Sequence, residues 1–231
     1  MRSFRLSHAG VVVEDADASL LIDPGSFSST EEIERALAAA APPAALVITH
    51  EHGDHWTAEH VRTIRRRTPE LPIFTTAATA EALRVEGIPG QVTVVHGGDR
   101  HSAGPFSLDF YGKDHAVLHS SIPVIENVGV IVNCTLAFGG DALVPPPQRA
   151  ELLGIPIGSP WSNIGEVMDF VLAAAPKRAY VTHDEMLSAA GRRMYSQRVE
   201  WCLAQSGGEL IELPRLDADT AARYEFAPRT R

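Results

Sequence analysis

The chain has 231 residues and a formal net charge of −9, from 20 lysine and arginine residues against 29 aspartate and glutamate residues. An acidic surface repels a phosphate backbone, so we expect no nucleic-acid partner. Hydrophobic residues make up 45% of the chain and charged residues 21%, which is ordinary globular usage and allows a large core without disulfides. Cys134 and Cys202 lie in apolar stretches and are predicted to be buried free thiols.

We expect neither an export signal nor a membrane-spanning segment. The first residues are not followed by the apolar run of roughly 7 to 15 residues that signal peptides contain. No apolar stretch approaches the length that spans a bilayer. We therefore expect a cytoplasmic protein that does not associate with membranes. The oligomeric state is left open, a homodimer included.

Short apolar or alternating runs predict strands, and apolar residues at helical spacing predict helices. Ser29 and Glu32 have the spacing of a capping box at the start of the first helix, which Pro42 and Pro43 stop. In chain order, the expected elements are strands over 10–14 and 19–22, this first helix, a strand over 45–48, a helix over 57–67, a strand over 72–75, a helix over 78–86, strands over 91–95, 106–110, within 128–138 and over 152–157, a helix over 163–175, a strand over 179–181, a helix over 187–205 and a strand over 209–213.

Hairpins and strand–helix units interleave along the chain, and no linker or low-complexity segment divides them. The pattern predicts one domain over residues 1–231, of α/β or α+β class, with sheets sandwiched between helices. Two strand ends are similar in sequence, because Thr49-His50-Glu51 and Thr182-His183-Asp184 each follow a predicted buried strand. Ligands grouped at strand ends are typical of sites in α/β sheets.

The central chemical signal is the segment His50-Glu51-His52-Gly53-Asp54-His55, directly after a predicted buried strand. His50 and His52 are two positions apart, so in extended backbone they share a face and can converge on one cation. Asp54 and His55 follow in a tight loop, for which we expect Gly53 to supply the backbone freedom. Three imidazoles and a carboxylate so close together favour metal coordination, because uncompensated burial of these groups would be costly.

The pattern His50-x-His52-x-Asp54-His55 resembles the signature of the metallo-β-lactamase superfamily. Three further segments follow that family's order, namely Leu21-Ile22-Asp23-Pro24-Gly25, Gly139-Gly140-Asp141 and Val181-Thr182-His183. The resemblance implies a four-layer αββα sandwich with a dinuclear metal site in a cleft. It implies that one ion takes His50 and His52, that the second takes Asp54, His55 and His183, and that Asp141 bridges the two.

Two divalent cations held about 3.5–4 Å apart need a carboxylate between them to offset their repulsion, and a water between them loses a proton near neutrality to give hydroxide. Because imidazoles are many and thiolates few, zinc is the expected metal, with Mn²⁺ and Fe²⁺ as alternatives. Asp54 is expected to be catalytic as well as a ligand, since it would orient the attacking water.

The resemblance leaves one ligand of the first ion to be found before Asp141, and His115 and His119 are the candidates. We predict His115, because a ligand should lie just past a strand end and residues 106–110 form the preceding strand. His119, beside Ser120 and Ser121, is predicted to be a catalytic or substrate-facing neighbour. The alternative stays open, because the His119 segment resembles the ligand segment of some compact relatives.

Six other polar or aromatic residues carry weaker expectations. Asp23 is expected to orient a ligand histidine. Ordinary packing is favoured over a cleft role for His8 and Trp56. His60 is expected to be solvated. Asp184 and Glu185 are expected to be surface acids, with a role in supporting a ligand as the alternative.

Within the superfamily, the chain most resembles a compact branch around ascorbate-6-phosphate lactonase and the N-acyl-phosphatidylethanolamine phospholipase. This implies hydrolysis of an ester, lactone or phosphodiester of a small-molecule substrate. Two alternatives stay open, a phosphodiesterase or nuclease acting on nucleotides and a non-catalytic metal-binding sensor on the same scaffold. Substrate-binding residues of such folds lie on variable loops, so the substrate itself is not predicted.

Overall fold

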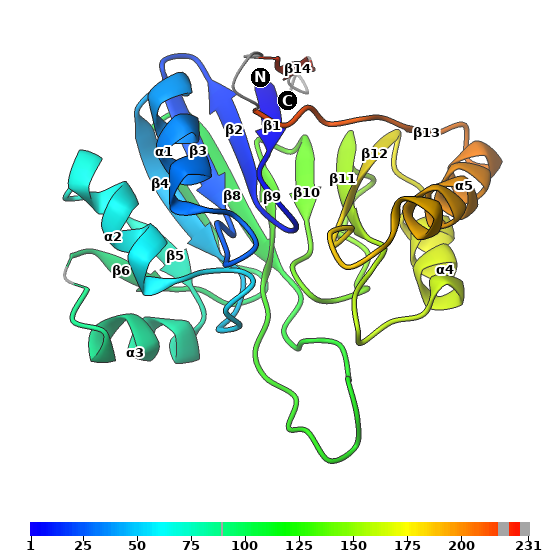
Figure 1. Ribbon diagram of the computed structural model, residues 1–231, viewed down its shortest axis with the longest axis horizontal. Helices are drawn as coiled ribbons and strands as arrows, with labels where there is room; N and C mark the ends of the chain where they lie inside the picture. The colour runs from blue at the N-terminus through cyan, green and yellow to red at the C-terminus, as the bar shows by residue number, and fades with distance from the viewer. Residues whose placement is uncertain (89, 217–221, 227–231) are drawn as a thin grey trace.

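Two mixed β-sheets face each other at the centre of the molecule, and helices cover their outer faces (Figure 1). The computed structural model describes residues 1–88, 90–216 and 222–226. The first sheet has the strand order β14-β1-β2-β3-β4-β5-β6. Its strands are β1 (Arg2–Arg5), β2 (Val11–Asp15), β3 (Ala18–Ile22), β4 (Pro43–Ile48), β5 (Ile73–Thr75), β6 (Val92–Val94) and β14 (Tyr224–Glu225).

The second sheet has the order β13-β12-β11-β10-β9-β8-β7. In both sheets one half is parallel, β3 to β6 in the first and β10 to β13 in the second. The strands of the second sheet are β7 (Arg100–Ala103), β8 (Phe106–Tyr111), β9 (Gly129–Val132), β10 (Leu136–Phe138), β11 (Leu152–Pro156), β12 (Arg178–Thr182) and β13 (Glu209–Leu210).

Each of the five helices among the described residues begins after a polar side chain that accepts a hydrogen bond from a backbone N–H of the first turn. The capping box predicted from Ser29 and Glu32 is incomplete, because Glu32 instead accepts from the Ser7 N–H at 2.9 Å and from the Ser7 hydroxyl at 2.8 Å. No helix in the described part of the chain is long and apolar enough to cross a membrane. The helices are α1 (Thr30–Ala39), α2 (Ala58–Arg67), α3 (Ala77–Val85), α4 (Ile164–Ala174) and α5 (Ala189–Gln205).

Three apolar clusters hold the four layers together. Alternation along β2 shows the division, since Val11 and Val13 belong to the cluster between the sheets and Val12 to the cluster under α1, α2 and α3. The third cluster lies between the second sheet and helices α4 and α5, around Phe170 and Val199. The predicted αββα sandwich is therefore confirmed.

Three strands escaped the sequence-based prediction, namely β1, β7 and β14. Their sequences are short and rich in polar residues, so they carry little apolar pattern of their own. β7 and β14 lie at sheet edges, and β1 lies between β14 and β2. Pairing with a neighbouring strand, and not local pattern, makes these segments extended.

Candidate metal centre

The predicted ligands come from the ends of strands in both sheets. Asp23 follows β3, His50 follows β4, Asp141 follows β10 by three residues and His183 follows β12. Carboxyl ends of parallel strands share one edge of a sheet, where ligands of α/β proteins bind. The donor atoms that follow these strands come together, so the strand ends of both sheets meet at one site.

The segment 49–56, which carries four of the predicted ligands, folds as a compact turn. The His55 N–H donates to the His52 carbonyl at 3.1 Å, which closes the turn. The Trp56 indole is buried and its Nε1–H donates to the Glu51 carbonyl at 3.1 Å. Trp56 therefore braces the turn from behind, in agreement with the packing role expected for it.

A second loop lies directly against this turn. A Cβ atom at Gly25 would collide with the backbone of Asp54, so only glycine permits this approach. The Ser26 N–H then donates to the Gly53 carbonyl at 2.9 Å. The expectation for Gly53 was wrong, because its φ is not positive and a Cβ there would meet nothing within 4 Å.

Asp23 fixes the orientation of two imidazoles, as expected. Its carboxylate accepts from the Thr49 N–H at 2.8 Å, from the Thr49 hydroxyl at 2.6 Å and from His55 Nδ1 at 2.7 Å. A carboxylate only accepts, so His55 bears its proton on Nδ1 and presents Nε2 to the site. The Thr49 hydroxyl proton is already donated, so its oxygen accepts from His50 Nδ1 at 3.0 Å and leaves His50 Nε2 to face the site.

His183 repeats this arrangement from the other sheet. Its Nδ1 lies 3.3 Å from the hydroxyl of Thr182, as that of His50 lies beside Thr49. The sequence similarity between the two strand ends therefore has a physical basis. His183 has φ +57° and Asp23 has φ +47°, a left-handed conformation that is rare outside glycine and often found at functional sites.

Asp184 supports this strand end and is not the surface acid that we expected. It is buried, and it forms ion pairs with Arg5 and, at 2.8 Å, with Arg192 Nε. Arg5 Nη1 also donates to the Val181 carbonyl at 3.0 Å. Arg5 on β1 thus binds both sides of His183, through the residue after it and the strand before it.

Two hydrogen bonds and the glycine before it hold Asp141 in place. Gly140 has φ +61°, and a Cβ there would collide with the Asn127 side chain. The Asp141 N–H donates to Asn127 Oδ1 at 3.0 Å. The Trp161 indole, also buried, donates its Nε1–H to Asp141 Oδ2 at 2.7 Å.

His115 lies in the long connection between β8 and β9. Its N–H donates to the Ile125 carbonyl at 2.9 Å, and the Ala116 N–H donates to the Asp141 carbonyl at 2.8 Å. His115 Nδ1 donates to the Ala116 carbonyl at 2.6 Å, so the unprotonated Nε2 faces Asp141 Oδ2 at 3.4 Å.

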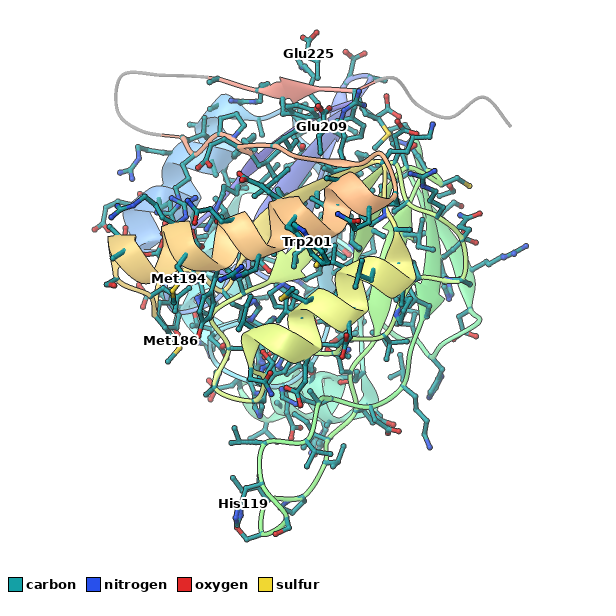
Figure 2. All side chains as sticks on the ribbon, turned by 90° about the vertical axis from the view of Figure 1, so that its right-hand side faces the viewer. His119, Met186, Met194, Trp201, Glu209 and Glu225 are labelled. Carbon is teal, nitrogen blue, oxygen red and sulfur yellow. The ribbon has the colours of Figure 1, made fainter. Side chains whose placement is uncertain are left out.

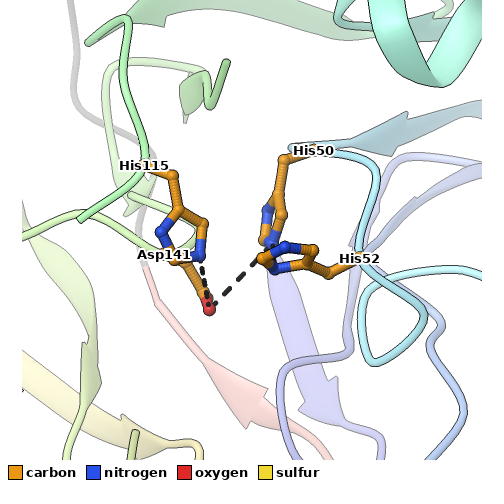
Figure 3. A group of neighbouring side chains, drawn as sticks. All are labelled: His50, His52, His115 and Asp141. Atoms are coloured by element: carbon orange, nitrogen blue, oxygen red, sulfur yellow. Dashed lines mark hydrogen bonds and ion pairs between the residues drawn. The ribbon is translucent and has the colours of Figure 1, made fainter. Parts of the chain in front are cut away.

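All seven predicted ligands lie together, in two groups of four that share Asp141. Within each group the ligand atoms lie within 4.8 Å of one another. Asp141 Oδ1 lies 2.8 Å from His183 Nε2 and 2.9 Å from His55 Nε2, whereas Oδ2 faces the other group. The first group, drawn in Figure 3, is His50, His52, His115 and Asp141, and the second is Asp54, His55, Asp141 and His183.

The charges of the site match a cation. Burial opposes ionisation of Asp141, but the surrounding imidazoles, His183 first, outweigh it and hold the pKa of the carboxyl well below its usual range. Burial likewise opposes protonation of His55, but the carboxylates of Asp141 and Asp23 raise its pKa well above the usual value. Burial lowers the pKa of His50 well below its usual value. The negative potential that attracts a proton to His55 would attract a metal ion equally.

The donor atoms fit two metal ions. His115 Nε2 and Asp141 Oδ1 are buried without a hydrogen-bond partner, although Oδ1 has ion-pair contacts with two imidazoles. His50 Nε2 lies 3.2 Å from His52 Nδ1, and His55 Nε2 lies 3.2 Å from His183 Nε2. Ring nitrogens that converge in pairs beside a carboxylate form a donor set suited to zinc and similar cations.

His119 is the one predicted site residue that the structure does not bring to the cluster. It lies at the tip of a projecting loop and is exposed (Figure 2). Its Nδ1 contacts the Ser121 hydroxyl at 2.7 Å. The Ser120 and Ser121 neighbours that suggested a cleft lining form the turn at this tip, so the local sequence gave no measure of how far the loop projects.

Two other histidines lie elsewhere than expected. His60 was expected to be solvated, but it is buried and its Nδ1 donates to the Pro24 carbonyl at 2.9 Å, which ties α2 to the loop after β3. His8 is buried at the site, with Nε2 3.5 Å from Asp54 Oδ2 and its ring stacked on Phe27 at 4.0 Å. Burial lowers the pKa of His8.

Asn127 and Trp161 were missed by the sequence analysis. Both contact Asp141, one through its backbone and one through its carboxylate. They are 14 and 20 residues away from it in sequence and belong to no spacing motif. Only the folded arrangement of the second sheet shows their role.

Comparisons with known proteins agree with this arrangement. The family model named Beta-lactamase superfamily domain matches residues 5–183. The chain belongs to this family. Protein Rv0786c of Mycobacterium tuberculosis is 31% identical over 204 residues, which are 86% of this chain and 91% of that protein.

Two solved structures share the fold. The metallo-β-lactamase fold protein YhfI of Bacillus subtilis matches with a TM-score of 0.70 and 15% identity, over 93% of this chain and 96% of that one. Igni18, a metallo hydrolase of Ignicoccus hospitalis, matches with a TM-score of 0.69 and 15% identity, over 98% and 99%. The family predicted from the His50 motif is thus confirmed, and the likeness to these two structures shows the fold alone.

Proposed function

We propose that the protein is a hydrolase with two divalent metal ions, acting on an ester, lactone or phosphodiester of a small molecule. The observation that supports this best is the position of Asp141, whose two carboxylate oxygens face two separate groups of donors. His50, His52 and His115 would hold one ion, and Asp54, His55 and His183 the other. We infer that the ions are zinc, and the same donors leave Mn²⁺ and Fe²⁺ as the alternatives to test.

Two ions bound here would supply a nucleophile at neutral pH and polarise the bond to be cleaved. Of the two candidate carboxylate ligands, Asp54 has the more suitable position for handling water, because its side chain is 30% exposed whereas that of Asp141 is 3% exposed. Contact with His8 and the nearby imidazoles outweigh burial and lower the pKa of Asp54, so it is an ionised acceptor. We assign to Asp54 the orientation of the attacking water.

For an ester, the water oxygen would bond to the acyl carbon and the acyl C–O bond would break. The departing alkoxide would take a proton from the water, giving an acid and an alcohol. His8 is placed to hold Asp54 during this step, with Nε2 at 3.5 Å. Asp23 and Thr49 keep the imidazoles of His50 and His55 in the orientation that the ions require.

The test begins with elemental analysis of protein purified without chelator and then loaded with zinc, manganese or iron. Loaded protein is then assayed with p-nitrophenyl acetate, a γ-lactone and bis(p-nitrophenyl) phosphate. We expect two ions per chain and metal-dependent hydrolysis of at least one compound. Cleavage of the phosphodiester alone would favour a nucleotide phosphodiesterase, and loaded protein that cleaves none would favour a metal sensor.

A further inference from the structure

A long loop projects from the sandwich beside the metal centre, and we name residues 116–125 the apolar loop (Figure 1). Its base is tied down by the bridge between Asp114 and Glu126 and by the Asn127 N–H, which donates to the Lys113 carbonyl at 2.9 Å. The base also carries His115, so the apolar loop begins directly after a candidate metal ligand.

The apolar loop exposes large hydrophobic side chains. Val117 is 63% exposed, Leu118 45%, Ile122 47% and Val124 49%. Single exposed apolar residues are common on soluble proteins, but four on one short loop form a group that usually marks a binding site. These apolar side chains stabilise nothing while water surrounds them, and they gain free energy only when an apolar group covers them.

Three of these four side chains line the cavity that also contains the candidate ligands. Leu118, Ile122 and Val124 form one wall of a cavity of about 170 Å³, and His52 and His115 form another. The wall of the apolar loop is therefore continuous with the metal centre. A molecule bound at the ions would lie against this wall.

The cavity has no cationic side chain to receive an anion. Apart from the histidines, the described residues that line it are apolar or are Asp54, Asp141 and Trp161, without lysine or arginine. Phosphate and carboxylate groups are usually held by arginine or lysine. The substrate part that lies against the apolar loop should therefore be uncharged.

The volume of the cavity limits the size of the substrate part that lies against the apolar loop. A dry apolar cavity of about 150 Å³ holds a benzene molecule, and the cavity here has about 170 Å³. Leu118 and Val124 line the cavity and are also exposed to solvent, so a short chain fits against them and a long chain would extend past them into solvent.

We propose that the substrate is an uncharged ester or lactone whose acyl part is a short apolar chain or ring of about six carbons, held against Leu118, Ile122 and Val124. This rests on the proposed function and specifies the part of the substrate that lies against the apolar loop. A lipid surface is the other occupant that exposed apolar side chains suit, but the net charge of −9 opposes the attraction to anionic lipids that such contacts commonly use.

The test measures binding and does not depend on turnover. Zinc-loaded protein is titrated calorimetrically with aceto-, butyro-, hexano- and decanohydroxamate, which bind metal ions and differ only in chain length. Affinity should rise by up to about fourfold per methylene and level off beyond about six carbons. The monohydroxamate of succinic acid, which adds a negative charge at the chain end, should bind more weakly than butyrohydroxamate.

Matched serine substitutions test whether the hydroxamate chain contacts the apolar loop. In Leu118→Ser and Val124→Ser, the affinity for hydroxamates should rise less with chain length than in the wild type. The affinity for acetohydroxamate and the content of two ions per chain should stay the same. Val85→Ser makes the same change at a 69% exposed residue at the end of α3 and should keep the wild-type series. A series equally steep in Leu118→Ser, Val124→Ser and the wild type would overturn the proposal, as would preferred binding of the succinic compound.

The outcomes also separate this proposal from the proposed function. Hydrolysis of p-nitrophenyl esters without chain-length preference, together with a flat hydroxamate series, would overturn the substrate class and keep the hydrolase. Loaded protein without two ions would overturn both. Sedimentation with phosphatidylcholine vesicles that is lost in Leu118→Ser, together with a flat series in the wild type, would assign the loop to a lipid surface and overturn the proposal.

Discussion

The two segments that carry most of the candidate histidines, residues 49–56 and the connection 112–127, are built in opposite ways. In the first, His50 and His55 are fully buried, and Asp23 and Thr49 fix their ring orientation. The second is tied only at its base, and beyond His115 it runs out into solvent. The difference separates two tasks, because metal binding needs rigid donors and substrate contact needs a surface that can vary.

The largest expected effect falls on the rigid segment. Asp54→Ala removes the partly exposed carboxylate that we assign to orienting the attacking water, and should lower kcat by about 10³-fold. The free energy of unfolding of the metal-free protein should fall by no more than about 1 to 2 kcal/mol, because the partly exposed carboxylate loses only its contacts with His8 and His55. Rates on the best substrate of the panel and urea unfolding measure the two effects. A near wild-type rate would show that Asp54 has another role.

A pair of substitutions on the second segment sharpens the comparison further. His115→Ala should lower the metal content from two ions toward one per chain, because Nε2 of His115 is one of four donors in its group. His119→Ala should keep both ions, because this side chain is exposed at the loop tip. Elemental analysis of both variants decides the matter, and loss of an ion in His119→Ala alone would mean that the loop folds back onto the site.

The same contrast explains what could be predicted from the sequence. His50 to His55 were identified because ligand chemistry dictates spacing. The apolar runs predicted sheets between helices, and the three clusters of the core use these runs. The four-layer αββα arrangement itself was predicted from the resemblance to the family. Asp184 and His60 were misjudged because their partners, Arg5 and the Pro24 carbonyl, lie far away in sequence. His119 was misjudged because a loop's direction depends on how its base is anchored, which no local pattern records.

A smaller effect is expected where a neighbour orients a ligand. Asp23→Asn should keep the fold but weaken metal binding by about 10- to 100-fold, because an amide is a poorer acceptor for His55 Nδ1 and the Thr49 hydroxyl than a carboxylate. Competition with a fluorescent zinc chelator measures this affinity. The matched control is Asp15→Asn, at the end of β2 in the turn before β3, which should leave the affinity unchanged. Equal loss in both variants would indicate a general effect of charge and not orientation.

The smallest effect concerns Trp161, the residue that belongs to neither segment but donates to the carboxylate between the two donor groups. Trp161→Phe keeps an aromatic ring against His115 and removes the N–H that lies 2.7 Å from Asp141 Oδ2. A hydrogen bond to a charged group contributes about 1.5 kcal/mol or more, so metal affinity should fall by about tenfold. Oδ2 already faces the first donor group, so an ion bound there would hold it in part without the indole, which keeps the loss below that of Asp23→Asn. Trp201→Phe, on the exposed face of α5, is the control and should leave the affinity unchanged (Figure 2). If Trp161→Phe binds metal as the wild type does but loses the chain-length preference for hydroxamates, Trp161 serves as a wall of the substrate cavity and not as a support for Asp141.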